Sequence, residues 1–270
     1  MRFILVLLLA VSFGMPTKAG QSALHKLVSA DEAKIWQGVG RINLTGAGFC
    51  TGALIAPDLV LTAAHCMYNP VTGVLLQPES IEFLAGWRNG RAAAKRKARR
   101  IFIHKNYVAG RSLKVSKVAS DIAIVELEHP ITTNAVKAFE RHAALKHGDL
   151  VKVVSYAQDR SEAPSIEESC QVLGYDPRAL VLTCNVDFGS SGAPIFILDQ
   201  GVPKIASVVS AKAVVDGKKV SLGASLGAPL EELLAQLHAN RGVFQSKKPT
   251  GRSISEQLGN IQAVAKVLRP

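Results

Sequence analysis

The chain has 270 residues, of which 48% are hydrophobic and 20% are charged, and it contains 22 glycines and 12 prolines. This composition excludes a disordered chain and indicates a turn-rich globular protein with one large domain or two smaller ones. The formal net charge is +11, which favours anionic partners such as nucleic acid, cell-surface polymers or anionic lipid.

The first nineteen residues have the features of a secretion signal. Arg2 supplies a positive start, residues 3–13 are apolar, and Thr17 and Ala19 are small residues before the expected cut. The apolar run is shorter than the roughly 20 residues that a membrane-spanning helix needs, and no later stretch is long and apolar enough. We therefore expect residues 1–19 to be a signal peptide, residues 20–34 to be an N-terminal or pro segment, and the mature protein to be secreted or periplasmic.

The middle of the chain contains short runs rich in Val, Ile and Leu, separated by Gly, Pro, Asn and Asp, which is typical of β-strands. Many short strands without alternating helices favour a barrel or a sandwich over βαβ units. The predicted strands span residues 39–44, 52–55, 59–62, 81–85, 100–104, 122–127, 150–156, 180–184, 195–198 and 205–211.

A basic run precedes the fifth predicted strand. It could bind an anionic surface, or it could be a solvated loop and barrel edge. It lacks the interleaved aromatic residues that stack on bases, so we expect no specific nucleic-acid binding. The cations of this run are Arg91, Lys95, Arg96, Lys97, Arg99 and Arg100.

Helices are expected at only a few places. Residues 62–68 are expected to form a short turn, and residues 229–238 place leucines at helical spacing behind Pro229. Residues 239–270 are polar and basic, so we expect a partly flexible tail that contains a weak helix over residues 254–268.

Three separated segments carry side chains that suit one nucleophilic site. Their sequences are LTAAHC, SDIAI and GSSGAP, and in chain order they supply His65, Asp121 and Ser191. A serine hydroxyl becomes a good nucleophile when a histidine takes its proton and a carboxylate holds the histidine tautomer. Each segment alone also fits a core histidine, a strand-end aspartate or a turn serine, but the combination is a strong signal.

These segments resemble the trypsin/chymotrypsin-like serine proteases, particularly the bacterial secreted or periplasmic members. The likeness covers roughly residues 36–237 and is most specific in FCTGALIAPDLVLTAAHC, residues 49–66. It implies an all-β fold of two packed six-stranded antiparallel β-barrels with a short C-terminal helix. We place the first barrel in residues 35–140, and the second barrel with its closing helix in residues 141–238.

The resemblance implies a serine endopeptidase that hydrolyses peptide bonds of a protein or peptide substrate through an acyl-enzyme intermediate. Ser191 would attack the carbonyl carbon, His65 would take its proton, and Asp121 would orient His65. The backbone N–H groups of Gly189 and Ser191 would form the oxyanion hole. No cofactor is expected. A catalytically silent family member that binds through its basic surface is the alternative.

The four cysteines are expected to form disulfides, because exported proteins meet oxidising compartments. Of the three connectivities that four cysteines allow, we expect the two local pairs. The resemblance places Cys50 and Cys66 around the histidine loop, which leaves Cys170 with Cys184. No two cysteines have the close C-x-x-C spacing of zinc sites, so no metal is expected.

The residue before the nucleophile is Ser190. Family members that are activated by cleavage carry an aspartate there, which pairs with the new N-terminus. Residues 34–38 resemble an activation site, but no carboxylate is present at position 190 to receive the new amine. We therefore expect the active-site loop to form without N-terminal insertion.

Substrate preference stays open at this stage. An ungapped count from Ser191 places neutral Asn185 at the base of the primary pocket, and Ser210 resembles a serine that lines the substrate strand, although a plain strand serine fits equally well. Asp187 could attract basic substrates and Lys212 could attract acidic ones.

Overall fold

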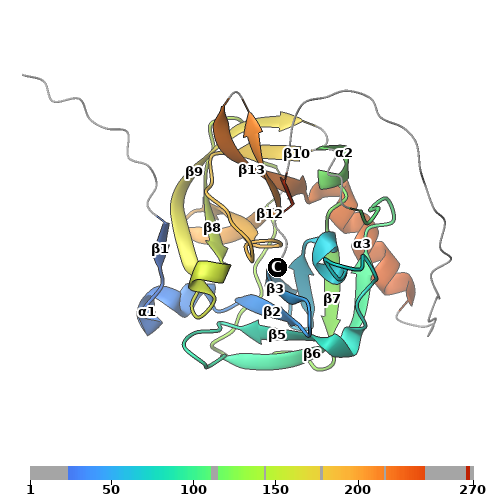
Figure 1. The fold of residues 1–270 in the computed structure, drawn as a ribbon. Helices are drawn as coiled ribbons and strands as arrows, with labels where there is room; N and C mark the ends of the chain where they lie inside the picture. Colours follow the sequence, from blue (N-terminus) through green and yellow to red (C-terminus); the bar gives the residue numbers. More distant parts are fainter. Residues whose placement is uncertain are drawn as a thin grey trace, which may run out of the picture.

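A computed structural model of the protein describes residues 24–110, 115–142, 144–176, 179–215, 217–240 and 266–267. Two antiparallel sheets dominate it, and they lie against each other with the C-terminal helix along one side (Figure 1). The predicted all-β fold is therefore confirmed. None of the helices among the described residues is long and apolar enough to cross a membrane.

The first sheet is a closed barrel of six strands in the order β2-β3-β4-β7-β6-β5. Successive side chains of a strand point to opposite faces, so every second residue of these strands points into the barrel. These inward side chains are mainly aliphatic, together with Phe83. The strands are β2 (Val39–Leu44), β3 (Gly48–Ala56), β4 (Leu59–Thr62), β5 (Ile81–Ala85), β6 (Ala94–Ile103) and β7 (Ala123–Leu127).

Six strands of the second sheet pair in a closed circuit, β8-β9-β10-β13-β12-β11, which returns to β8. Two short strands add to this circuit: β1 (Leu24–Lys26) pairs with β9, and β14 (Lys266–Val267) pairs with β12. The six strands are β8 (Leu150–Ser155), β9 (Ser165–Asp176), β10 (Ala179–Leu182), β11 (Pro194–Asp199), β12 (Val202–Val215) and β13 (Lys218–Ser225).

One hydrophobic cluster joins the two sheets and the C-terminal helix. The Phe196 ring lies 5.0 Å from the Trp36 ring and 4.7 Å from the Phe139 ring, measured between centroids. Helix α3 (Gly227–Asn240) buries the leucines of its inner face in the same cluster, and it begins two residues before the predicted start. This shared core fixes the two sheets relative to each other, and the candidate site draws on residues from both.

The other helices are single turns. Helix α1 (Ala30–Ala33) begins with a capping box, in which Ser29 and Glu32 bond each other's backbone N–H groups. The remaining turns are η1 (Lys34–Trp36), η2 (Ala64–Met67), η3 (Pro78–Ser80), α2 (Val115–Val118) and η4 (Gln158–Arg160).

Two sequence-based predictions about the basic segments are wrong. Five of the six cations of the basic run lie on β6, which pairs with β5 and β7 inside the closed barrel and is neither a loop nor an edge. The predicted strand over residues 100–104 covers only the second part of β6. The first part was missed because its buried residues, Ala94 and Ala98, are small while their basic neighbours face outward. In the tail, the part of residues 254–268 that the structure describes is strand β14 and not a helix; the rest lies outside the described residues.

Candidate active site

His65 is carried by the short turn η2, directly after β4. The disulfide between Cys50 and Cys66, with an S–S distance of 2.03 Å, joins this turn to β3. His65 and Cys66 are both buried, with exposed fractions of 6% and 0%. The bond therefore restrains the backbone next to the imidazole. The second disulfide joins Cys170 to Cys184, so both pairs are those expected from the sequence.

Asp121 lies fully buried just before β7, and its carboxylate binds the histidine at two points. Oδ1 accepts the backbone N–H of His65 at 2.8 Å, and Oδ2 lies 2.7 Å from Nδ1 of the ring. The Ser210 hydroxyl on β12 also donates to Oδ2. Because an ionised carboxylate only accepts hydrogen bonds, this arrangement favours a proton on Nδ1 and leaves Nε2 as an acceptor.

Ser191 lies in a buried turn that is bonded to both sheets. Its carbonyl oxygen accepts the N–H of Thr51 on β3 at 2.9 Å, and the Thr51 hydroxyl donates to the Gly189 carbonyl at 2.8 Å. On the other side, the N–H of Gly192 donates to the carbonyl of Val209 on β12 at 2.8 Å. Val209 precedes Ser210, which contacts Asp121, so the three predicted segments meet at one place.

Two glycines allow this turn. Gly189 has φ +94°, and a Cβ there would lie 2.5 Å from the Phe49 ring and 2.9 Å from the Cα of Ala157. Gly192 has φ +74°, and a Cβ there would lie 2.0 Å from the Thr62 hydroxyl and 2.8 Å from the backbone nitrogen of Ala63. Both positions therefore require glycine for conformation and for space.

We expect Gly192→Ala to lower the free energy of unfolding by about 3 kcal/mol, because left-handed strain and a clash with backbone add. Gly46→Ala is the matched control: Gly46 has φ +72°, and a Cβ there would meet nothing within 4 Å, so only the strain of about 1 kcal/mol applies. Urea unfolding of both variants measures the difference. If both variants lost the same free energy of unfolding, the close contacts around Gly192 would not contribute to the cost of the added Cβ.

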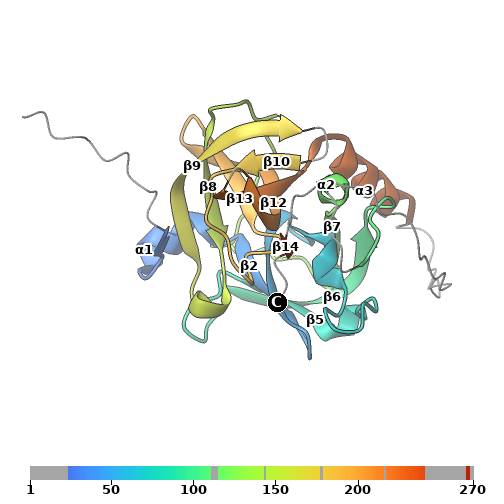
Figure 2. The same cartoon turned by 45° about the horizontal axis from the view of Figure 1, so that its top comes forward.

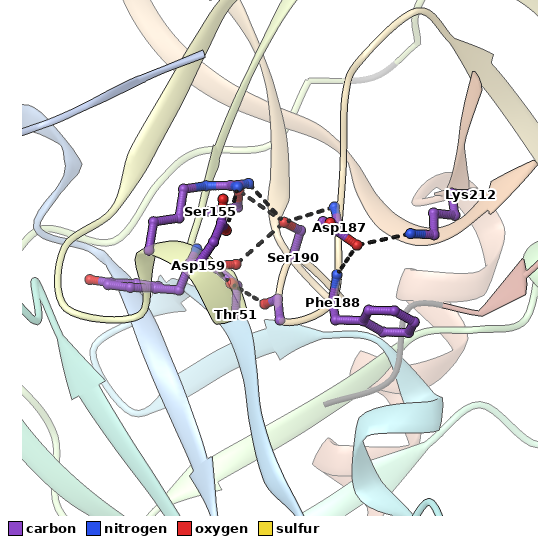
Figure 3. Close-up of polar contacts among 10 residues, drawn as sticks. Thr51, Ser155, Asp159, Asp187, Phe188, Ser190 and Lys212 are labelled. Atoms are coloured by element: carbon purple, nitrogen blue, oxygen red, sulfur yellow. Dashed lines mark hydrogen bonds and ion pairs between the residues drawn. The ribbon is translucent and has the colours of Figure 1, made fainter. Parts of the chain in front are cut away.

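Behind the nucleophile turn lies a buried polar cluster that the sequence did not reveal. The Ser190 hydroxyl donates to the Ser155 hydroxyl at 3.2 Å (Figure 3). The Arg160 guanidinium lies 3.4 Å from the Ser190 hydroxyl. The Arg160 side chain is only 10% exposed and also pairs with Asp159 at 3.0 Å. A cation thus lies in this chain behind Ser190, the residue that precedes Ser191.

Glu167 on β9 borders the same cluster. Its carboxylate accepts the N–H of Asn185 at 2.7 Å, and burial raises the pKa of Glu167 to about 7, against the smaller opposing effects of that hydrogen bond and of Arg160. Asn185 itself is exposed and lies close to this carboxylate through its backbone. Whether Asn185 forms the base of a substrate pocket stays a prediction.

The raised pKa of Glu167 predicts a pH-dependent stability. From its usual pKa of 4.5 up to about 7, the folded state holds a proton that the unfolded state releases, so this carboxyl destabilises the fold increasingly as pH rises. Glu167→Gln removes the titration, and its Tm relative to wild type should rise between pH 4.5 and pH 8. The exposed variant Glu79→Gln is the control; parallel curves for wild type and Glu167→Gln would contradict the prediction.

The two charges that left the substrate preference open pair with each other. Lys212 Nζ lies 2.8 Å from Asp187 Oδ1, and this pairing lowers the pKa of Asp187 (Figure 3). The same ammonium lies 4.7 Å from the centre of the Phe188 ring. Because Lys212 and Asp187 partly neutralise each other, each attracts a charged substrate less than an isolated charge would.

A surface cleft opens beside His65. It lies between the segment that follows η2 and the segment that follows β6. Sequence reasoning missed its lining, because these residues belong to loops without a distinctive motif. They are Tyr68, Asn69, Pro70, Val71, Thr72, Gly73, Tyr107, Ala109 and Gly110, together with His65.

The one group of three potential metal ligands in the described part of the chain does not suit a metal ion. It consists of Cys50, His65 and Cys66. The two cysteines are joined by a disulfide and offer no thiolate, and His65 is bonded to Asp121 through Nδ1.

Comparison with known proteins agrees with this geometry. The family model described as Trypsin matches residues 28–224, and the chain belongs to this family. Trypsin Blo t 3 of Blomia tropicalis is 27% identical over 152 residues, which cover 54% of this chain and 53% of that protein. Coagulation factor IX of Cavia porcellus is 29% identical over 116 residues, which cover 41% of this chain and 36% of that protein. The chain thus spans about half or less of these curated relatives.

Among solved structures, that of a Glu endopeptidase in complex with MPD superposes with a TM-score of 0.66. The sequence identity is 21%, and the superposition covers 82% of this chain and 98% of that one. At this identity the likeness establishes the trypsin-like fold. The assignment to the bacterial members of the family stays a prediction.

Proposed function

We propose that the protein is a serine endopeptidase in which Ser191, His65 and Asp121 form the catalytic triad. The observation that carries this proposal is the convergence of the three segments, in which Asp121 binds His65 and the turn of Ser191 is bonded to the strand of Ser210. Membership of the trypsin family and the name of the endopeptidase with the similar fold support it.

In this mechanism, the Ser191 oxygen attacks the carbonyl carbon of the scissile peptide bond while His65 Nε2 takes the hydroxyl proton. The carbonyl oxygen gains negative charge, which the N–H groups of Gly189 and Ser191 stabilise. His65 then returns the proton to the leaving amine, which leaves an acyl-enzyme. Water attacks the ester with His65 again as the base, which releases the acid and restores Ser191. Asp121 stabilises the protonated imidazole throughout.

We further propose that the active-site loop is assembled without a new N-terminus. The described residues before Ile35, 24–34, are part of the fold: β1 pairs with β9, and Leu27 is 2% exposed. Behind the loop, Arg160 approaches the Ser190 hydroxyl, where a cleavage-activated relative would bring an amine to an aspartate. An internal cation therefore takes over part of the role of the released amine.

Labelling with a fluorophosphonate tests both proposals. The mature chain, with an intact bond between Lys34 and Ile35 confirmed by mass, should incorporate one label at Ser191. A folded protein that takes up no label would favour the catalytically silent binding protein. Label that appears only after cleavage before Ile35 would overturn independence from the N-terminus while keeping the protease assignment.

The substrate is proposed to be a protein or peptide, and the described residues favour no charged side chain at the cleaved position. Profiling with a peptide library, with Ser191→Ala as the control, would define the preference. The outward face of β6 could also bind an anionic surface through Lys95, Lys97 and Arg99. This surface is partly neutralised, because Arg100 pairs with Glu126 and Lys97 lies opposite Glu82.

A further inference from the structure

The C-terminal strand β14 lies on the edge of β12 beside the proposed catalytic residues. The two strands lie next to each other in Figure 2. Val267 pairs with Ala211 and Lys266 pairs with Lys212, in antiparallel orientation. Ala211 is the residue directly after Ser210, whose hydroxyl donates to Asp121. Lys266 and Val267 thus reach the strand that contributes to the candidate site.

This edge is open to an added strand. β13 covers one side of β12 along its whole second half, from Ser207 to Val215. β11 covers the other side only as far as Val208, which pairs with Pro194 just after the nucleophile turn. Among the described residues, β14 alone pairs with that side beyond this point. An extended peptide can use such an edge through main-chain hydrogen bonds, whatever its side chains.

We propose that β14 is an intramolecular inhibitor that occupies the edge where an extended substrate would pair. This inference rests on the proposed protease function. An extended substrate that added to this edge would need the backbone groups of Ala211 and Lys212 that β14 already uses. Substrate and β14 therefore exclude each other.

The covalent connection makes such a short strand effective. β14 belongs to the same chain as β12, so its binding to β12 is intramolecular. Twenty-five residues separate the end of α3 at Asn240 from Lys266. Connections of this length give effective concentrations in roughly the millimolar range, which lets a weak contact compete with substrate. The pairing that the structure describes comprises two residues, Lys266 and Val267, and so short a pairing is readily displaced.

A double variant of the full chain, Lys266→Pro with Val267→Pro, tests the proposal. Of two adjacent residues in an antiparallel strand, one points its N–H into the ladder, so two prolines remove that donor whichever residue supplies it. KM for a peptide substrate should fall about three- to tenfold with kcat unchanged, which is the effect of losing a tethered competitor. The control, Lys266→Ala with Val267→Ala, keeps both N–H groups and should retain the wild-type KM.

The inhibitor should also act in trans. A synthetic peptide of residues 262–270, added to the double-proline variant, should raise KM again in a competitive manner. Equal KM values for all forms, together with no inhibition by the peptide, would overturn the inhibition and leave the protease assignment intact. No cleavage and no fluorophosphonate label in any form would overturn the proposed function, and the inhibition with it.

Discussion

Replacing Ser191 by alanine is expected to lower kcat about 10⁶-fold, the scale seen when a triad loses its nucleophile. In the proposed mechanism the Ser191 oxygen forms the acyl-enzyme. The hydroxyl of the preceding Ser190 cannot replace it, because it points back toward Ser155 and Tyr156. Steady-state hydrolysis of a peptide substrate measures the loss, with wild-type active sites counted by fluorophosphonate labelling and the variant, which lacks the labelled hydroxyl, normalised by the concentration of folded protein.

Ser207→Ala is the matched control for this change. Ser207 is also a buried serine, 1% exposed, and its hydroxyl donates to the Ala224 carbonyl at 2.7 Å. Losing that hydrogen bond should cost roughly 1 kcal/mol of stability and leave kcat unchanged. A Ser191→Ala variant that kept more than about one per cent of wild-type kcat would refute Ser191 as the nucleophile, given the expected scale.

Much of the fold was predictable because it depends on local patterns. Strands such as β2, β4 and β5 have bounds that match the predicted runs, because short apolar segments between turn residues usually form strands. Strands β9 and β13 were missed. In β9 the run is interrupted by Glu167 and Glu168, and in β13 it begins with two lysines and contains Gly223, so neither shows a clear alternation.

For the candidate site, the proposed catalytic residues, the Cys50–Cys66 disulfide and Ser210 were named from the sequence, and most of the other supporting residues were not. His65, Asp121 and Ser191 lie in short motifs that can be read locally. The supports are contacts between distant residues: Thr51 binds Gly189 across 138 positions, and Arg160 approaches Ser190 across 30. Their residue types are common and their spacing is set by the packing of two sheets, so no local pattern indicates them.

The pairing of β14 with β12 illustrates the same limit. The tail is polar and basic, and its sequence predicts partial flexibility and a weak helix, not a strand at Lys266 and Val267. The two residues that pair with β12 do so through their backbone, which carries no sequence signature.

Replacing Asp121 by asparagine is expected to lower kcat about 10⁴-fold while leaving the fold intact. The carboxylate accepts from the His65 backbone N–H at one oxygen, and from the Ser210 hydroxyl at the other, which also faces His65 Nδ1. An amide that keeps the backbone contact must turn its NH₂ group toward Nδ1. The imidazole then carries its proton on Nε2, where it can no longer accept one from Ser191.

Two further variants separate this tautomer effect from general damage. Asp149→Asn removes an exposed carboxylate that only caps a turn, by accepting the Lys146 N–H, and should not change kcat. Ser210→Ala keeps the carboxylate and removes one of its donors, so a smaller loss of about tenfold is expected if Ser210 positions Asp121, and none if it is a plain strand serine. The tautomer of His65 depends on Asp121, and the position of the Asp121 carboxylate depends on Ser210. The loss of kcat should therefore be largest for Asp121→Asn, smaller for Ser210→Ala and absent for Asp149→Asn. An Asp121→Asn variant with near wild-type kcat would show that His65 does not act as the base.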